Sequence, residues 1–326
     1  MQRAAARRWS SVLVIALGTW VFVPSAVAAF PERPVRLIVP LAPGGGVDIT
    51  ARALAQKLTG AWKQSVVVDN RAGGTGVIGL ELAAKSAPDG HTLVFITGTH
   101  TARPATERNL PYDLVKDFAP VTQVTRQAYV LVVHPAVPAK TLPELIAYAR
   151  EKPGALTYGS AGLGSLQHFS GELLAIGTRT QLRHIAYKGG GPALVDVVAG
   201  HISMVFATPL ESVPHIKGGR LRALAVTGAQ RSTAMPELPA VAEANVPGYE
   251  VTNWYAVLAP AKTPRRLVEA LNAGFVEAVK SSDMAERFTR DGVEPVGSTA
   301  EALREHIRSE LDKWQRVVAT AGLKAE

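Results

Sequence analysis

The hydrophobic pattern of residues 35–58 predicts a strand, a glycine-rich loop and a helix in direct succession. Val35, Leu37, Ile38 and Val39 form an apolar run that suits a strand buried on both faces. Pro40 ends this strand because it has no N–H to donate, and Gly44, Gly45 and Gly46 follow it. Apolar positions then recur at helical spacing as far as Leu58. Such a loop leaves N–H groups at the positive end of a helix, which is a generic site for an anion.

The same alternation of strands and helices continues to residue 97. Strands are predicted at residues 65–68 and 92–97, with a helix at 77–85 between them. Strand–helix–strand units with short loops form a parallel sheet that carries helices on its faces. This part of the chain therefore predicts one α/β unit.

A second set of strands and helices fills residues 126–249, and an extended segment at 249–259 leads back to the first unit. Helices at 264–280, 284–290 and 300–319 follow. We therefore predict an α/β protein of two lobes, each a mostly parallel sheet flanked by helices, with a ligand cleft between them. Residues 29–125 and 250–326 would form lobe 1, and residues 126–249 would form lobe 2. The crossing between the lobes is expected at residues 125–127.

The first 28 residues have the pattern of a secretory signal peptide. Arg3, Arg7 and Arg8 precede an apolar run over residues 12–23, and small residues follow it up to Ala28. The alternative is an uncleaved membrane anchor, but a run of about twelve residues is shorter than the roughly 20 that a membrane span needs. We expect cleavage before Ala29 and an exported, soluble chain.

Composition excludes several classes of function. Removal of the signal would leave 298 residues and lower the formal charge from +8 to +5, because it takes away three arginines and no acid. The remaining charge is dispersed, so no basic patch favours a nucleic-acid partner. The absence of cysteine excludes disulfides, thiolate metal sites and a cysteine nucleophile. The histidines lack zinc-ligand spacing, and no metal is expected.

A dinucleotide motif over residues 74–79 is a false match. The letters spell G-x-G-x-x-G, but a dinucleotide site needs the glycines directly after the strand and an acid at the end of the next strand. Here the glycines come later, and the next strand ends at Thr97. The glycines are better explained by a helix that begins close to the sheet, and no cofactor is expected.

Two more glycine loops, at residues 159–165 and 187–192, also follow predicted strands. The first of them could belong to a serine hydrolase that uses Ser160 with His168 and Asp196 as partners. A nucleophile elbow, however, needs glycine two positions before the serine, and Tyr158 stands there. Ser160 and Ser165 are better interpreted as hydroxyl donors at a helix N-terminus. Ligands of open α/β sheets bind at this carboxyl edge.

Several segments together resemble the substrate-binding proteins of tripartite tricarboxylate transporters, also called Bug receptors. The similar segments cover nearly the whole mature chain in the family's order: residues 39–48, 51–52, 70–74, 88–93, 158–165 with His168, 187–193, 219–226 and 239–244. The resemblance implies a periplasmic binding protein of type II that closes about a hinge. It implies small carboxylate ligands held by backbone amides, hydroxyls and water. One departure is Leu41, where the family commonly has an aromatic residue, and this changes the near wall of the cleft.

The resemblance also implies the ligand-binding residues by position. In lobe 1 they would be Gly44, Gly45, Gly46, Asp48, Thr97 and Thr99, with Asp48 also holding the first loop in shape. In lobe 2 they would be Ser160, Gly162, Ser165, His168, Tyr187, Gly189 and Thr208. The second loop, residues 159–165, is expected to be the other half of a carboxylate clamp.

We therefore expect a monomeric periplasmic receptor, not an enzyme, for a small carboxylated metabolite. The ligand would be a di- or tricarboxylate, an acidic amino acid or an aromatic acid. Membrane transporter subunits or a sensor kinase are the expected partners. The alternatives are an exported serine hydrolase that uses Ser160, and an adhesion or scaffold module whose cleft is filled by side chains.

Overall fold

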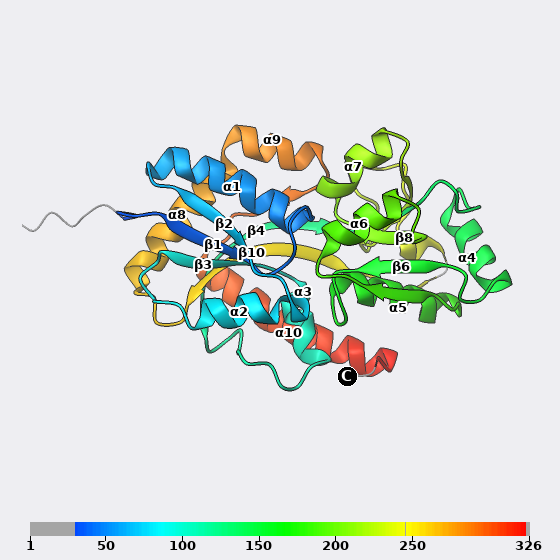
Figure 1. Cartoon of the computed structure of the whole chain (residues 1–326), viewed down its shortest axis with the longest axis horizontal. Coiled ribbons are helices and arrows are strands. Elements are labelled where there is room, and N and C mark those ends of the chain that lie inside the picture. The colour runs from blue at the N-terminus through cyan, green and yellow to red at the C-terminus, as the bar shows by residue number, and fades with distance from the viewer. Residues whose placement is uncertain (1–29, 245, 324–326) are drawn as a thin grey trace, which may run out of the picture.

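The protein is described by a computed structural model over residues 30–244 and 246–323. The predicted signal peptide, residues 1–28, lies outside these residues. Two α/β lobes stand side by side, each around its own sheet (Figure 1). Over the described residues, none of the helices combines the length and the apolar character that a membrane crossing requires.

The first lobe is built on a six-stranded mixed sheet. Its strands lie in the order β11 (Glu294–Pro295), β4 (Phe118–Ala128), β10 (Thr252–Pro260), β3 (Thr92–Thr97), β1 (Val35–Val39) and β2 (Val66–Asn70). Its helices are α1 (Gly46–Trp62), α2 (Val77–Ala84), α3 (Thr99–Ala102), α8 (Arg265–Lys280), α9 (Ser282–Arg290) and α10 (Ala300–Ala321). β1 pairs in parallel with β2 and β3, which confirms the predicted βαβ series. β10 is antiparallel to both of its neighbours.

The first strand is apolar at every position except Arg36 because helices cover both faces of its sheet. Leu37 and Val39 point to the face where they share a core with α1 and α8. Ile38 points to the opposite face, where it shares a core with Leu80 of α2 and Leu303 of α10. Successive side chains of a strand point to opposite faces, so a strand covered on both sides needs a continuous apolar run.

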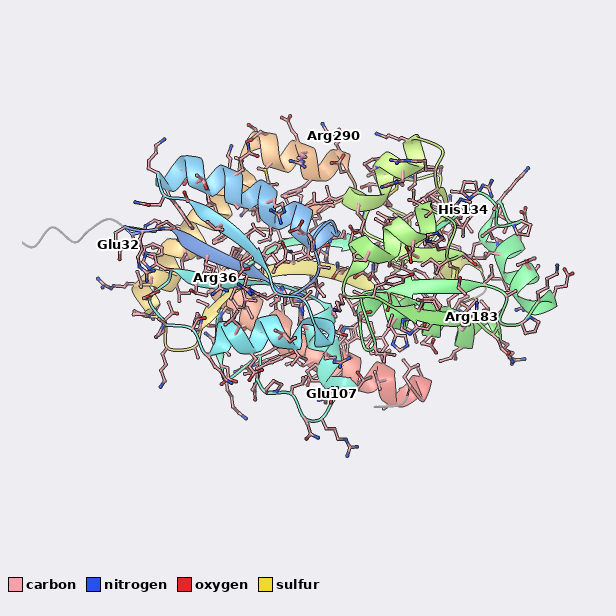
Figure 2. The ribbon with its side chains drawn as sticks, in the orientation of Figure 1. Glu32, Arg36, Glu107, His134, Arg183 and Arg290 are labelled. Atoms are coloured by element: carbon pink, nitrogen blue, oxygen red, sulfur yellow. The ribbon has the colours of Figure 1, made fainter. Side chains whose placement is uncertain are left out.

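The second lobe is built on a five-stranded mixed sheet. Its strands lie in the order β7 (Arg183–Ala186), β6 (Thr157–Ser160), β8 (Met204–Ala207), β5 (Val130–Val133) and β9 (Arg222–Val226). Its helices are α4 (Leu142–Glu151), α5 (Leu166–Thr178), α6 (Gly190–Val198) and α7 (Pro209–Lys217). The labelled charged residues Glu32, Arg183 and Arg290 are exposed and lie at the periphery of the two lobes (Figure 2).

The C-terminal helix α10 packs against both lobes. Leu303 in its first half belongs to the core of the first lobe, together with Trp254 of β10. Trp314 in its second half stacks on Phe169 of α5, with ring centroids 5.3 Å apart. Between them, Glu310 accepts a hydrogen bond of 3.2 Å from each of the two indole N–H groups. The helix therefore ties the lobes together along one side, where it is drawn in red in Figure 1.

Two local predictions are wrong. Residues 125–127 are not a crossing, because β4 continues through them to Ala128 and pairs there with Thr252 of β10. The chain enters the second sheet two residues later, at Val130. No helix is predicted over residues 209–217, where α7 lies. Its prolines obscure the helical pattern, although Pro209 stands at the first helical turn, where no N–H is needed.

Candidate functional site

The two lobes meet around a small polar cavity of about 30 Å³. This volume has room for little more than one or two water molecules. The first lobe contributes the loop before α1, the end of β3 and two residues of β10. The second lobe contributes the N-terminal turns of α5, α6 and α7, together with Ala161 of the second glycine loop and Tyr129 before β5.

The first loop, residues 40–46, lies directly against the second lobe. The N–H of Gly46 donates to Oε2 of Glu211 on α7 at 2.9 Å. The N–H of Ala42 donates to the carbonyl oxygen of Lys188 at 2.9 Å. A Cβ placed on Gly191 would lie only 2.7 Å from backbone atoms of this loop, so glycine is needed there for the lobes to approach.

Asp48 holds the first loop from behind. Its Oδ2 accepts from the N–H of Gly44 at 3.0 Å and from Arg52 at 2.9 Å, and its Oδ1 accepts from Asn70 at 3.0 Å. Burial alone would raise the pKa of Asp48, but hydrogen bonds from Arg52, Gly44 and Asn70 outweigh it and lower the pKa. The carboxylate is therefore fully used in shaping the loop.

Glu211 places a buried carboxylate in the cavity wall. The residue is 4% exposed and stands at the third position of α7. Its Oε1 accepts from the N–H of Thr208 at 2.7 Å, while Oε2 accepts from Gly46. Burial raises the pKa of Glu211, and the two backbone N–H groups oppose that rise. Since both donors stand at helix N-termini, the ionised form is stabilised by the ends of α1 and α7.

Two threonine hydroxyls face the cavity from the first lobe. Thr97 Oγ1 accepts from the N–H of Thr99 at 3.1 Å. Thr99 Oγ1 accepts from the N–H of Leu166, the first residue of α5, at 3.2 Å. Because each hydroxyl oxygen accepts from a backbone N–H, each hydroxyl keeps its own hydrogen to donate.

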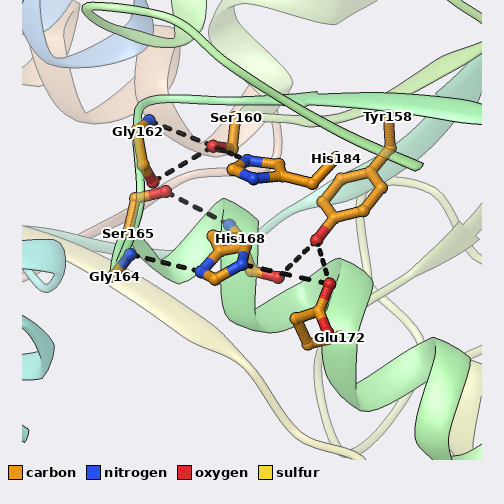
Figure 3. A network of polar contacts seen from close by, with 8 residues as sticks. All are labelled: Tyr158, Ser160, Gly162, Gly164, Ser165, His168, Glu172 and His184. Carbon is orange, nitrogen blue, oxygen red and sulfur yellow. Dashed lines mark hydrogen bonds and ion pairs between the residues drawn. The ribbon is translucent and has the colours of Figure 1, made fainter. Parts of the chain in front are cut away.

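The second loop, residues 159–165, makes most of its polar contacts within its own lobe (Figure 3). Ser160 is fully buried, and its Oγ lies 2.6 Å from Nε2 of His184 and 3.0 Å from the N–H of Gly162. Ser165 caps α5 by accepting from the N–H of His168 at 3.2 Å. The hydroxyls of this loop are therefore occupied.

Two histidines stack beside this loop and are neutral at physiological pH. The ring centroids of His168 and His184 are 4.3 Å apart. Burial lowers the pKa of His168 to about 4, with a smaller effect from Arg103. Burial and the neighbouring His168 lower the pKa of His184 to about 4. Nδ1 of His168 lies 3.2 Å from the N–H of Gly164 and can accept from it, as neutral imidazole allows.

The structure brings only some of the predicted ligand-binding residues to the cavity. Those that line it are Gly45, Gly46, Thr97, Thr99 and Thr208. Those that lie outside its lining are Gly44, Asp48, Ser160, Gly162, Ser165, His168, Tyr187 and Gly189. The third loop, residues 187–192, lies directly against the first loop, and the second loop contributes Ala161 to the lining. The hydroxyl of Tyr187 donates to Asp196 instead, at 2.6 Å.

Several lining residues were not predicted from the sequence: Tyr129, Gln167, Gly190, Glu211, Asn253 and Tyr255. Glu211 had a detectable signal, because Thr208 and Glu211 have the spacing of a capping box and Pro209 suits the first helical position. The described residues include no group of three histidine or acidic side chains placed to hold a metal ion.

Two α/β lobes that close on a polar cavity define a two-lobed solute-binding protein. Residues 50–323 match the model of the Tripartite tricarboxylate transporter family receptor, and the chain belongs to this family. It is 37% identical over 307 residues to Protein BugT of Bordetella pertussis, which covers 92% of this chain and 93% of BugT.

Solved structures agree with this assignment. The structure of periplasmic binding protein BugD has a TM-score of 0.88 and 28% identity, and covers 91% of this chain and 100% of that one. R. palustris Rpa4515 with adipate has a TM-score of 0.86 and 36% identity, and covers 90% of this chain and 98% of that one. The predicted two-lobed periplasmic binding protein fold is therefore confirmed.

Proposed function

We propose that this protein is a periplasmic receptor that binds a small carboxylated metabolite between its lobes. One observation carries the proposal: the N-termini of α1, α6 and α7 converge on the interlobe cavity from two lobes. Helix N-termini attract anions, and here they already hold one carboxylate, that of Glu211. The adipate bound by R. palustris Rpa4515 supports an organic acid as the ligand class.

Binding requires the lobes to separate and close again. The cavity of about 30 Å³ is too small for an organic acid of several carbons. An acid that enters the opened cleft would meet backbone N–H groups and threonine hydroxyls, each contributing about 1.5–3 kcal/mol to a charged ligand. After the cost of ordering, several such bonds give an affinity on the order of micromolar.

The remaining parts of the proposal concern the cell. The predicted signal peptide, cleaved before Ala29, would deliver the chain to the periplasm as a monomer. The lobe division would follow the sequence prediction except at the end of β4, so that lobe 1 would comprise residues 29–128 and 250–326, and lobe 2 residues 129–249. Closure reshapes the outer surface of both lobes, and membrane transporter subunits or a sensor kinase would recognise that surface.

Calorimetry against a panel of organic acids, acidic amino acids and aromatic acids tests the function. Saturable binding without turnover of the ligand is the expected result. Native mass spectrometry of the purified protein would detect an acid that is retained from the cell. If no compound in a broad panel bound and no acid were retained, the receptor proposal would be wrong.

A serine hydrolase is the second candidate, because Ser160 Oγ lies 2.6 Å from His184 Nε2. The partner is His184 rather than the predicted His168, and Asp196 instead binds Tyr187 and His201. Among the described residues, no carboxylate hydrogen-bonds to His184, and Ser160 is fully buried. Ester turnover by the wild type that disappears in Ser160→Ala would favour this candidate over the receptor.

A further inference from the structure

A buried acidic side chain stands in a cavity that is proposed to hold an acid. Glu211 is 4% exposed and lines the cavity, and each of its two oxygens accepts a backbone N–H, from Thr208 and from Gly46. Both oxygens therefore act as acceptors, as those of a carboxylate do. A ligand with carboxylates alone would bring like charge beside this group. Like charges in a site of low dielectric repel strongly, so Glu211 opposes such a ligand.

A second acceptor lies next to Glu211 and has no partner. Gln167 is 3% exposed, and its Nε2 donates to the carbonyl oxygen of Phe206 at 2.7 Å. A carbonyl can only accept, so this contact fixes the orientation of the amide and leaves Oε1 as the free atom. No donor among the described residues reaches Gln167 Oε1. Oε1 of Gln167 and Oε1 of Glu211 each lie 3.5 Å from the point that a Cβ on Gly190 would occupy.

The first lobe contributes two hydroxyl donors to the same cavity. The hydroxyls of Thr97 and Thr99 each accept a backbone N–H and have a hydrogen left to donate. Both residues belong to the first lobe, whereas Gln167 and Glu211 belong to the second. The cavity therefore combines two hydroxyl donors from one lobe with a pair of side-chain acceptors from the other.

We propose that the ligand is a carboxylate that also carries a protonated amine, as an amino acid does. This inference rests on the proposed receptor function and specifies its ligand class. The ammonium group would donate to Glu211 and Gln167, and the carboxylate would accept from Thr97 and Thr99. Closure of the lobes then brings the ammonium group against Glu211 and Gln167 and the carboxylate against the two threonines.

Calorimetry at neutral pH with pairs of acids that differ only in an amino group tests this inference. Suitable pairs are aspartate and succinate, glutamate and glutarate, and 6-aminohexanoate and hexanoate. In at least one pair the amino acid should bind about tenfold more tightly or better, the effect of one charged hydrogen bond. If the acids without an amine bound as tightly as their partners, the inference would be wrong and the receptor function would stand. Binding by no member of any pair would count against both.

Glu211→Gln provides the matched variant. The single amide oxygen of glutamine can still accept from the N–H of Thr208, which retains the cap of α7, while the charge and the acceptor for the N–H of Gly46 are lost. The preference for the amino acid should fall by about tenfold. A purely structural role for Glu211 would instead weaken both members of a pair equally and leave their ratio unchanged.

Glu144→Gln is the control, because Glu144 also stands at the third position of a capped helix in the second lobe. It does not line the cavity, so both affinities should stay as in the wild type. The pairwise comparison on the wild type decides the inference even if Glu211→Gln does not fold.

Discussion

The second and third glycine loops of the second lobe are similar in composition but differ in what their polar groups contact. The second loop follows β6 and the third follows β7, which are neighbouring parallel strands. The hydroxyls of the second loop contact groups of their own lobe, as in the contact between Ser160 and His184 of β7. In the third loop the hydroxyl of Tyr187 turns to Asp196, and the backbone at Lys188 and Gly191 lies against the first lobe.

This difference shows what makes a glycine loop a binding loop. Glycine provides backbone freedom in both loops, but freedom alone does not create a site. In the second loop, Ser160 accepts the N–H of Gly162, so the local hydroxyl satisfies the donor. In the third loop the backbone comes close to the other lobe because no side chain intervenes. The four predictions below test this contrast, from the largest expected effect to the smallest.

The stability of the protein should fall with acid because of the histidines beside the second loop. His168 and His184 have folded pKa values of about 4, below their ordinary value of 6.5. The unfolded chain therefore takes up protons first, so stability is complete above pH 6.5 and is lost as the pH falls from 6.5 towards 4. The loss should be on the order of 3 kcal/mol, with partial exposure taken into account.

Urea denaturation at several pH values measures this effect. The double variant His168→Gln, His184→Gln should show a shallower loss over the same window. His201→Gln, which changes an exposed histidine of the same lobe, should follow the wild type. Equal slopes for the double variant and the wild type would show that these two rings are not the cause.

Gly191→Ala should impair closure at the third loop. The new Cβ would lie 2.7 Å from backbone atoms of the first loop, whereas alanine suits the helical position itself. Overpacking costs about 1–3 kcal/mol, so ligand affinity should fall by roughly 5- to 150-fold while the melting temperature changes little. Gly60→Ala is the control, since its Cβ would meet nothing within 4 Å. Unchanged affinity in Gly191→Ala would contradict the proposed closed contact.

Ser160→Ala should act on stability and leave ligand affinity unchanged. It removes the partner of His184 Nε2 and of the Gly162 N–H, and an unsatisfied buried group costs about 1–3 kcal/mol. Urea denaturation and calorimetry on the same sample separate the two effects. A large loss of affinity would show instead that the second loop belongs to the binding site, as predicted from the sequence.

Thr75→Ala should weaken binding slightly. The hydroxyl of Thr75 donates to the carbonyl oxygen of Leu163 at 3.1 Å, and this is a contact of the second loop with the first lobe. One neutral hydrogen bond contributes about 0.5–1.5 kcal/mol, so affinity should fall by roughly 2- to 10-fold. Calorimetry with the acid of the panel that binds most tightly measures it, with Thr59→Ala as a control inside α1. An effect on affinity as large as that of Gly191→Ala would show that the second and third loops contribute equally to ligand binding.

Much of the fold could be predicted because its signals are local. The apolar run of β1, the glycines after it and the helical spacing up to Leu58 all lie within about two dozen residues of one another. The prolines of α7 removed such a signal at residues 209–217, and Glu211 was missed with the helix. The false crossing at 125–127 has a similar cause, since polar residues such as Arg126 are compatible with a strand once a partner pairs with it.

The sequence by itself determined the α/β units, the glycine loops at the ends of strands and the family that these segments resemble. Only the tertiary structure decided which loop meets which, and that Glu211 stands in the cavity. Gly46 and Glu211 are 165 positions apart, and the strand order and the approach of the two lobes bring them within 2.9 Å. A hydrogen bond across a cleft depends on the packing of both lobes, and no local pattern of residues encodes that distance.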